Sequence, residues 1–266
     1  RIWIALACLM ALHGCLYGFL WPDLPAEAWW WLGISGVIGL AIGDQFLYRA
    51  LVDAGPRVTT LIMAGVPAIT ASMAWPALQQ PIGGWGLVGM AVTLAGIIWV
   101  VRQRPHAQGR TYPKPTRGVI LAFAAAICQA IGLITSKLGM DDPAQGMSVD
   151  PWTASLSRII LAAPACTLIL LVWLRMNTAE RPAPSPIPST ALLITIGAIF
   201  GPFLGVGLAL VSIDHIDAGI AATLMATSPI MILPFTRLFE KERIGTHAFW
   251  GAILAVCGVG ILFLMP

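Results

Sequence analysis

The sequence predicts an all-α membrane protein, a polytopic bundle of hydrophobic helices. Of the 266 residues, 58% are hydrophobic and only 10% are charged, and the mean hydropathy is +0.84. A soluble domain carries about 25% charged residues, because its surface has to face water. The second observation is a series of long, uninterrupted apolar runs, and the third is a similarity between the two halves of the chain.

The apolar runs predict nine membrane-spanning helices. A helix needs about 20 mostly apolar residues to cross about 30 Å of hydrocarbon. The runs show no period of two, which favours helices over membrane strands. The predicted spans are Ile2–Leu20, Trp29–Leu51, Val58–Ala77, Ile82–Val101, Gly118–Ser136, Pro151–Leu174, Ala191–Ile213, Ala218–Phe235 and Ala248–Met265.

Basic residues gather in alternate connections, which predicts the orientation of the helices. Thirteen of the 15 lysines and arginines fall on one face, and only Lys137 and Arg158 fall on the other. Cytoplasmic loops are enriched in Lys and Arg, so we expect the basic face, with the linker 103–116, in the cytoplasm. The expected localisation is therefore the cytoplasmic (inner) membrane, crossed several times.

Matching residues in the two halves lie 162 positions apart, which predicts an internal repeat. The predicted first repeat is 1–102, with four helices, and the second is 117–266, with five. Arg1-Ile2 aligns with Arg158-Ile159 at a smaller spacing of 157, as a longer 175–190 loop in the second half would produce. Arg158 lies 41 residues after Arg117, where the second repeat begins, so we expect about 40 further residues, enough for one helix, ahead of Arg1. The matching pairs are Gly39/Gly201, Gly43/Gly205, Met63/Met225, Ala64/Ala226, Pro67/Pro229, Gly89/Gly251 and Gly96/Gly258.

Five helices in each repeat would turn the second repeat upside down relative to the first. We therefore predict five-plus-five inverted-topology repeats, with the first helix missing and nine spans present. Many secondary transporters have this architecture and bind their substrates near the bilayer midplane, between the repeats. The architecture favours a transporter over a channel.

Two stretches of the sequence are similar to the EamA domain of the drug/metabolite transporter superfamily. They read GDQFLYRALVDAGPRVTTLIMAGVPAITASM and GVGLALVSIDHIDAGIAATLMATSPIMILPF, each followed by a helix with two spaced glycines. The family pattern has Ala-Leu at the end of its third helix, a proline in the fourth and then a Gly-Glu-Arg-like turn. Ala50-Leu51 and Glu242-Arg243 match this pattern, whereas Ser212-Ile213 and Gln79-Gln80 depart from it.

The resemblance implies ten helices, inverted repeats and the transport or export of small metabolites or amphipathic compounds by alternating access. The alternative is a membrane-embedded enzyme or lipid-handling protein without transport activity. The sequence contains no phosphate-binding loop, HExxH or GxSxG motif, so we predict no enzyme activity, cofactor or metal. The expected partners are a small-molecule substrate, membrane lipids and a coupling proton, and not nucleic acid.

Asp44 is the first candidate for a substrate-binding or coupling residue. Its counterpart in the second half is the apolar Val206, and Tyr48 lies one turn later on the same helical face. Tyr48 would either pack against its neighbours, which is the default for an aromatic residue, or stack on an aromatic ligand. A carboxylate in a membrane helix costs at least a few kcal/mol unless it is paired, protonated or turned to the interior. The two interpretations are a site for a cation or proton, and a structural ion pair with Arg49 or another neighbour.

Arg158 is the second candidate, because it lies about seven residues inside its predicted helix. It would meet an anionic group, pair with an acid, or extend its long side chain to the membrane surface. His13 is a lone polar residue in an apolar run; we predict that it makes an interhelical hydrogen bond, and the alternative is contact with a ligand.

Pro67 and Pro229 are predicted hinges, since proline interrupts the hydrogen-bond ladder of a helix. Interrupted segments at matching places in two repeats point to a transport site. The freed carbonyl groups would face a cavity; the alternative is a kink that only shapes the packing. The hydroxyl groups expected near them belong to Thr59, Thr60, Thr227 and Ser228.

Overall fold

The computed structural model describes residues 1–79, 83–103, 114–142, 147–176, 188–227 and 246–264. The chain divides into two compact units. Unit 1 contains Arg1–Ile42 and Thr135–His215, and unit 2 contains Gly43–Ile134 and Ile216–Pro266. Each unit therefore combines segments from both predicted repeats.

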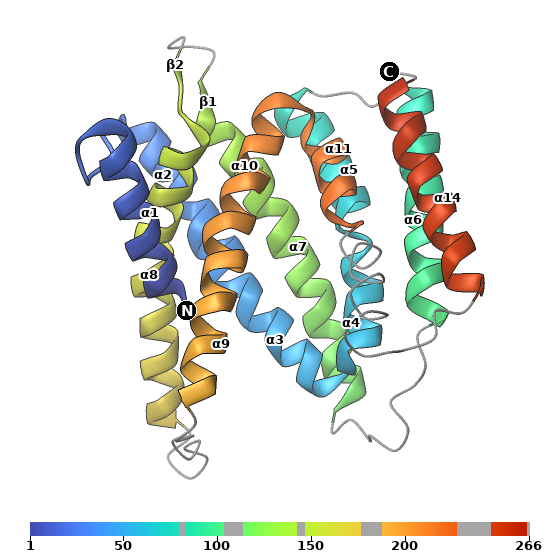
Figure 1. Ribbon diagram of the computed structural model, residues 1–266, viewed down its shortest axis with the longest axis horizontal. Coiled ribbons are helices and arrows are strands. Elements are labelled where there is room, and N and C mark those ends of the chain that lie inside the picture. Colours follow the sequence, from blue (N-terminus) through green and yellow to red (C-terminus); the bar gives the residue numbers. More distant parts are fainter. Residues whose placement is uncertain (80–82, 104–113, 143–146, 177–187, 228–245, 265–266) are drawn as a thin grey trace. The chain divides into compact units, whose positions relative to one another are not determined.

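Unit 1 is built on helices, with one short β-hairpin at its end (Figure 1). Strands β1 (Asp141–Asp142) and β2 (Met147–Ser148) are antiparallel, and Asp141 faces Ser148 across the pair. The last residues of helix α7, from Thr135 on, also belong to unit 1. The other elements are α1 (Ile2–Tyr17), α2 (Ala26–Ser35), the π-helix η1 (Gly36–Gly43, of which Gly43 lies in unit 2), α8 (Pro151–Met176), α9 (Pro188–Ala198), the π-helix η2 (Ile199–Gly205) and α10 (Val206–His215).

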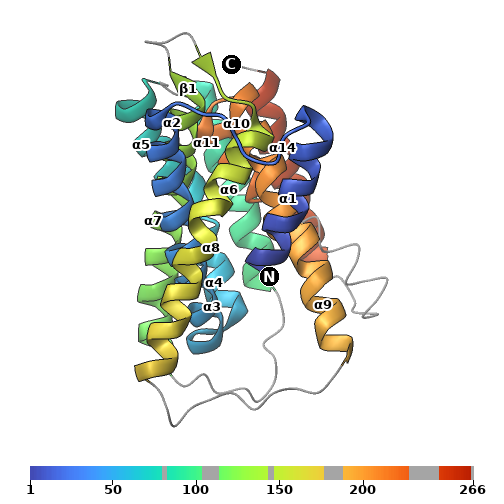
Figure 2. The same cartoon turned by 90° about the vertical axis from the view of Figure 1, so that its left-hand side faces the viewer.

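The core of unit 1 lies where α1, η1 and α8 meet, and α1 and α8 lie side by side in both views (Figures 1 and 2). A glycine allows η1 to approach α8 closely, because a Cβ atom on Gly36 would overlap the backbone of Arg158. A hydrogen bond of 3.0 Å also joins α1 to α8, donated by the indole nitrogen of Trp3 to Thr167 Oγ1. The buried core residues are Ala5, Leu9, Leu40, Leu156, Ile159 and Ala162.

Unit 2 is also helical, and among its described elements α6 and α14 pack against each other most extensively. Helix α7 enters it through its first part, up to Ile134, and Arg117 near the start of α7 lies 3.6 Å from the carboxylate of Asp53. The elements of unit 2 are α3 (Asp44–Asp53), α4 (Gly55–Met63), α5 (Val66–Leu78), α6 (Gly84–Gln103), α7 (Pro115–Met140, shared with unit 1), α11 (Ala218–Met225) and α14 (Thr246–Leu264).

Helices α6 and α14 pack through glycines in a symmetrical way. A Cβ atom on Gly96 would lie 2.5 Å from the amide nitrogen of Ala255 and 2.7 Å from the carbonyl oxygen of Gly251. A Cβ atom on Gly258 would overlap Thr93 and lie 2.8 Å from the carbonyl oxygen of Gly89. Each set of contacts becomes the other when 162 is added or subtracted. The contact positions rise along α14 as they fall along α6, so the two helices are antiparallel, as Figure 1 shows.

Five helices of the described part are long and apolar enough to cross a membrane, and they confirm the predicted all-α membrane bundle. Two shorter apolar helices, Ile2–Tyr17 and Gly84–Trp99, correspond to two further predicted spans. The predicted span Ala218–Phe235 is described only as far as Thr227, and the predicted span Ala248–Met265 corresponds to α14. The five long segments are Ala26–Asp53, Val58–Leu78, Pro115–Met140, Pro151–Met176 and Ala191–His215.

The boundaries of the helices share the spacing of 162 residues. The π-helices end at Gly43 and Gly205, and the helices α3 and α10 that follow them end at Asp53 and His215. Helices α2 and α9, which precede the π-helices, begin at Ala26 and Pro188. The two halves of the chain therefore form the same succession of elements, including the rare π-helix, which often marks a functional site.

Candidate functional site

The interior of unit 1 contains a group of polar side chains between its apolar helices. Ser35 at the end of α2 and Ser136 in the last part of α7 are both fully buried, and their Oγ atoms are 2.6 Å apart. On α8, the hydroxyl of Ser157 donates a hydrogen bond of 2.9 Å to the carbonyl oxygen of Thr153. The Oγ atom of Ser155 is buried and has no hydrogen-bond partner among the described residues. A polar layer thus crosses unit 1 at the level of Ser155–Arg158.

Arg158 lies in this layer, and its side chain does not reach the surface. The residue is 4% exposed, so the interpretation that it extends to the membrane surface is wrong. Its backbone is in close contact with Gly36, the first residue of the π-helix η1. A buried guanidinium is costly and is found in membrane proteins mainly where it faces an interior partner or a cavity. Arg158 is therefore an interior charge of unit 1.

The π-helix η1 sets the start of α3 and hence the position of Asp44. Asp44 is the first residue of α3, directly after Gly43, and it is half-buried. Tyr48 follows one turn later on the same helix and is 38% exposed. At the corresponding place in the second half, Val206 packs on the apolar core of unit 1. The two copies therefore share the π-helix and differ in the side chain that follows it.

A second pair of interruptions lies after α4 and α11. Helix α4 ends at Met63, and the turn is closed by a hydrogen bond of 2.9 Å from the Gly65 amide to the Ile62 carbonyl oxygen. Helix α11 ends at Met225, and the matching bond of 3.1 Å runs from Thr227 to Leu224. The two helix ends are 162 residues apart, and so are the two hydrogen bonds. The two halves of the chain therefore turn in the same way.

One of the predicted hinge prolines, Pro67, directly follows the first of these helix ends. Pro67 is buried and is the second residue of α5, where proline is well accommodated because the amide there needs no helical partner. The helix thus breaks just before the proline. Pro229 and Ser228 lie outside the described residues.

The three described threonines near the interruptions turn their hydroxyl protons to their own helices. Thr59 is buried and donates to the Gly55 carbonyl oxygen at 2.9 Å, and Thr60 donates to the Pro56 carbonyl oxygen at 2.8 Å. Thr227 donates to the carbonyl oxygen of Leu224 at 2.6 Å. Hydroxyl groups bonded in this way bend helices, and their oxygens can still accept a hydrogen bond.

The structure places these candidates in different units. Asp44 and Tyr48 lie on α3 in unit 2. Thr59, Thr60 and Thr227 belong to other segments of unit 2, whereas Arg158 belongs to unit 1. Sequence reasoning did not single out the Ser35–Ser136 pair or Ser155. The only local signal is that Ser35 precedes Gly36, and small polar residues do not reveal by spacing which helix they will face.

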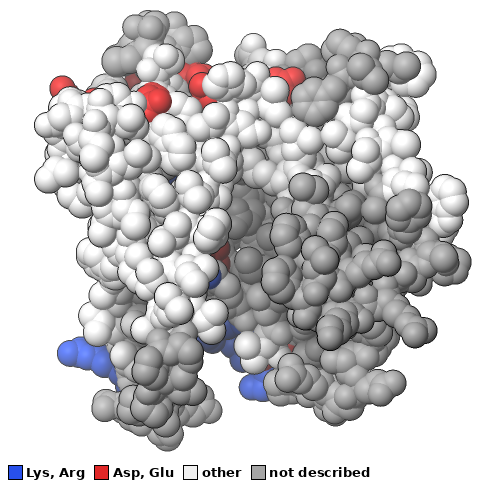
Figure 3. Space-filling model, viewed as in Figure 1, with Lys and Arg blue, Asp and Glu red and all other residues white. Residues whose placement is uncertain are grey.

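Charges at the two ends of unit 1 differ in sign. Figure 3 shows carboxylates where unit 1 carries β1 and β2, and lysine or arginine atoms at its opposite end. Lys137 is an exception at the acidic end, but its ammonium group lies 2.8 Å from the Asp141 carboxylate and donates to the Asp214 carbonyl oxygen at 3.3 Å. The charge of the buried Lys137 ammonium group is therefore neutralised by the Asp141 carboxylate.

Apolar side chains on the outside and polar groups in the interior define a polytopic membrane protein. Leu168 on α8 and Leu193 on α9 are more than 60% exposed, whereas Arg158 and Ser35 are buried. The chain also matches the model of the EamA-like transporter family over residues 1–102 and 116–264. It therefore belongs to the EamA-like transporter family, as the motifs of the two repeats indicated.

Comparison with solved structures supports the fold. One chain, described only as "Crystal structure of protein", superposes with a TM-score of 0.76 at 17% sequence identity, over 99% of this chain and 85% of that one. No curated protein matches this sequence.

Proposed function

We propose that this protein is a secondary transporter, which moves small metabolites or amphipathic compounds across the cytoplasmic membrane by alternating access. The observation that carries the proposal is the pair of interruptions that recur in both halves of the chain. Each half has a π-helix followed, one helix later, by a helix that ends in the same hydrogen-bonded turn, at Met63 and at Met225, 162 residues apart. Interrupted helices at matching places in two repeats are typical of transport sites.

The antiparallel packing of α6 on α14 supports inverted repeats. Two equivalent helices that are related by an axis in the membrane plane run in opposite directions, and their contacts exchange under the repeat spacing. The contacts of Gly96 and Gly258 exchange in this way. Inverted repeats offer two conformations of similar energy, one open to each side, which is what alternating access requires.

Asp44 and Arg158 are the interior charges that we assign to substrate binding and coupling. Asp44 follows the π-helix of the first half, where the second half has Val206, so it breaks the symmetry of the two copies directly after the π-helix. A carboxylate there would bind a cationic group of the substrate or carry a coupling proton. Arg158 would bind an anionic group. The substrate then bears a charge of at least one sign, and a gradient drives its movement.

Transport into proteoliposomes tests this function. Uptake of a panel of labelled metabolites is measured with and without a pH gradient, for the unchanged protein and for Asp44→Asn and Arg158→Gln. Saturable uptake of at least one compound, with a rate reduced at least tenfold in Asp44→Asn, is the expected result. Asp53→Asn is the matched control, because Asp53 is the last residue of the same helix and its carboxylate is paired with Arg117. The proposal fails if no compound is transported, or if both aspartate variants behave alike.

A further inference from the structure

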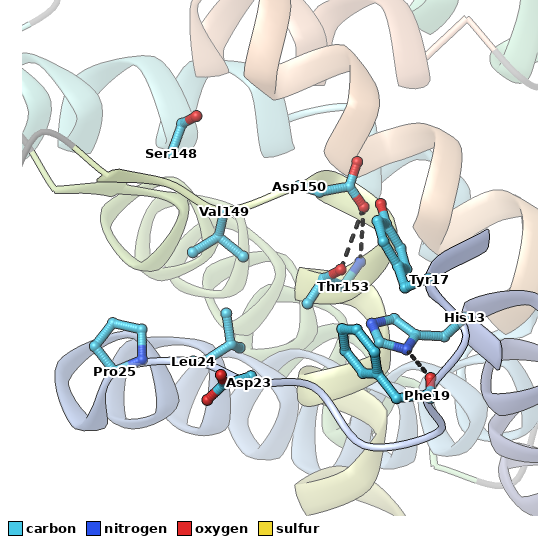
Figure 4. A pocket seen from close by; sticks show the side chains of 10 residues that line it. All are labelled: His13, Tyr17, Phe19, Asp23, Leu24, Pro25, Ser148, Val149, Asp150 and Thr153. Atoms are coloured by element: carbon cyan, nitrogen blue, oxygen red, sulfur yellow. Dashed lines mark hydrogen bonds between the residues drawn. The ribbon is translucent and has the colours of Figure 1, made fainter.

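A pocket of about 220 Å³ lies at the acidic end of unit 1, and none of the residues assigned to transport lines it (Figure 4). All of its walls belong to unit 1. They come from the end of α1, the connection between α1 and α2, the residues between β2 and α8, and the first turn of α8. The lining residues are His13, Tyr17, Phe19, Asp23, Leu24, Pro25, Ser148, Val149, Asp150 and Thr153.

Three rings form one wall of the pocket. The ring of His13 is packed between those of Tyr17 and Phe19, with centroid distances of 4.7 and 5.2 Å. His13 is 3% exposed, and its Nδ1–H donates to the carbonyl oxygen of Phe19 at 2.8 Å. This bond fixes the connection after α1 instead of joining two helices, so the predicted interhelical bond is wrong. The rings are therefore held rigidly against one another.

Two carboxylates line the pocket, Asp150 on one side and Asp23 on the other (Figure 4). Asp150 is fixed because its Oδ2 atom caps α8, accepting hydrogen bonds from the amides of Trp152 at 3.0 Å and Thr153 at 3.1 Å. The hydroxyl of Tyr17 points to this carboxylate (Figure 4). Asp23 is exposed and makes no ion pair with another described residue. No lysine or arginine lines the pocket, so its potential attracts cations.

The remaining walls are apolar and come from Leu24, Pro25 and Val149. An inorganic cation would have to lose its water to reach these walls and has no apolar surface to bury against them, whereas an ammonium group with a short hydrocarbon body would contact both the apolar walls and the rings. Aromatic faces attract organic cations, and the effect is largest where water is excluded. Drug-sized ligands occupy about 300–1,000 Å³, so this pocket suits a smaller molecule.

We propose that this pocket binds a small organic ammonium compound with an apolar body. The ammonium group lies near Asp23 and Asp150, and the apolar body lies against Phe19, Tyr17 and Leu24. Neither Asp44 nor Arg158 lines the site, and its occupation does not depend on whether the chain transports anything. Its place at the acidic end of unit 1 makes it a site for a ligand that arrives from that side of the membrane.

Direct binding to the full chain in lipid nanodiscs tests the proposal. Calorimetric titrations at low ionic strength and neutral pH use benzylammonium, the uncharged benzyl alcohol of almost the same shape, and benzoate. We expect saturable binding of benzylammonium, affinity for benzyl alcohol lower by about tenfold, and no binding of benzoate, because the walls carry only negative charge beside the rings. Equal affinity for benzylammonium and benzyl alcohol would show an apolar pocket without cation selectivity and would overturn the proposal.

Two variants locate the bound cation. Asp23→Asn leaves the shape of the connection unchanged and should weaken benzylammonium binding about fivefold, and Phe19→Leu should weaken it about threefold. Glu27→Gln is the matched control, because Glu27 is an exposed acid in the first turn of α2 and does not line the pocket. If Asp23→Asn binds as tightly as the unchanged protein, or if Glu27→Gln loses as much affinity as Asp23→Asn, the ligand is not in this pocket.

Discussion

The hydroxyl oxygen of Thr93 on α6 lies 3.5 Å from the carbonyl oxygen of Ala255 on α14, and the two residues are 162 positions apart. They are therefore equivalent residues of the two halves, and they meet near the centre of the contact between two equivalent helices. The same hydroxyl donates to the Gly89 carbonyl oxygen of its own helix at 2.8 Å. Such a self-complementary contact is the arrangement expected at a twofold axis between repeats.

Adding a methyl group at the centre of this contact should destabilise the protein. Gly96→Ala and Gly258→Ala each place a Cβ atom against backbone atoms of the facing helix, which cannot move without separating α6 from α14. We expect a loss of about 1–3 kcal/mol in the free energy of unfolding for each, measured by denaturant titration in detergent. Gly260→Ala is the control on α14, since no atom lies within 4 Å of its added Cβ. Equal stability of all three variants would contradict the observed packing.

Gly36→Ala should separate α2 from α8, because the new Cβ atom would overlap the backbone of Arg158. Overpacking of this kind costs about 1–3 kcal/mol, and here it would also displace the polar layer of unit 1. Thermal unfolding of the detergent-solubilised protein measures the cost. Gly197→Ala on α9 has open space around its Cβ atom and should be nearly neutral. A Gly36→Ala protein as stable as the Gly197→Ala protein would argue against the close contact.

The hydrogen bond between Ser35 and Ser136 should contribute modestly to stability. The two oxygens are buried and 2.6 Å apart, and interhelical hydrogen bonds in membrane proteins contribute about 0.6 kcal/mol on average. A double-mutant cycle with Ser35→Ala and Ser136→Ala should return a coupling energy of about that size. Additive effects of the two single changes would show that the serines are not coupled.

The two partners of the Lys137–Asp141 ion pair should respond differently to neutralisation. The Lys137 side chain is 10% exposed and the Asp141 side chain is 42% exposed. Asp141→Asn leaves a buried ammonium group with only the Asp214 carbonyl oxygen to satisfy it, whereas Lys137→Met leaves a carboxylate that water can hydrate. Urea titration should therefore show the larger loss of stability for Asp141→Asn. The opposite order would mean that Lys137 is hydrated and the ion pair contributes little.

Features that depend on hydropathy and glycine spacing could be predicted from the sequence. The apolar runs placed the helices within a few residues, for example Gly118–Ser136 for the observed Pro115–Met140. The sequence predicts that the glycine pairs of α6 and α14 are equivalent. It does not predict that the glycines of one helix contact those of the other. Contact between helices depends on the fold, and a spacing along the chain does not state it.

The candidate site was less accessible to such reasoning. Arg158 was recognised as an exception in an apolar helix, whereas the serines that share its layer look like ordinary small residues in the sequence. Thr59, Thr60 and Thr227 are predicted to lie near the carbonyl groups freed by the prolines, and the structure shows their hydroxyl protons bonded to carbonyl oxygens of their own segments. The π-helices were not predicted, because a shift from an α to a π hydrogen-bond pattern leaves the apolar period almost unchanged.

Site-directed labelling tests the central claim, that the two repeats are inverted in the membrane. Glu27 and Ser189 are equivalent residues, 162 positions apart, at the second position of α2 and α9. Single cysteines are introduced as Glu27→Cys and Ser189→Cys in a chain from which Cys8, Cys15, Cys128, Cys166 and Cys257 have been removed. The account predicts that a membrane-impermeant maleimide added outside intact cells labels position 27 and reaches position 189 only after the membrane is permeabilised. Labelling of both positions from the same side would contradict it.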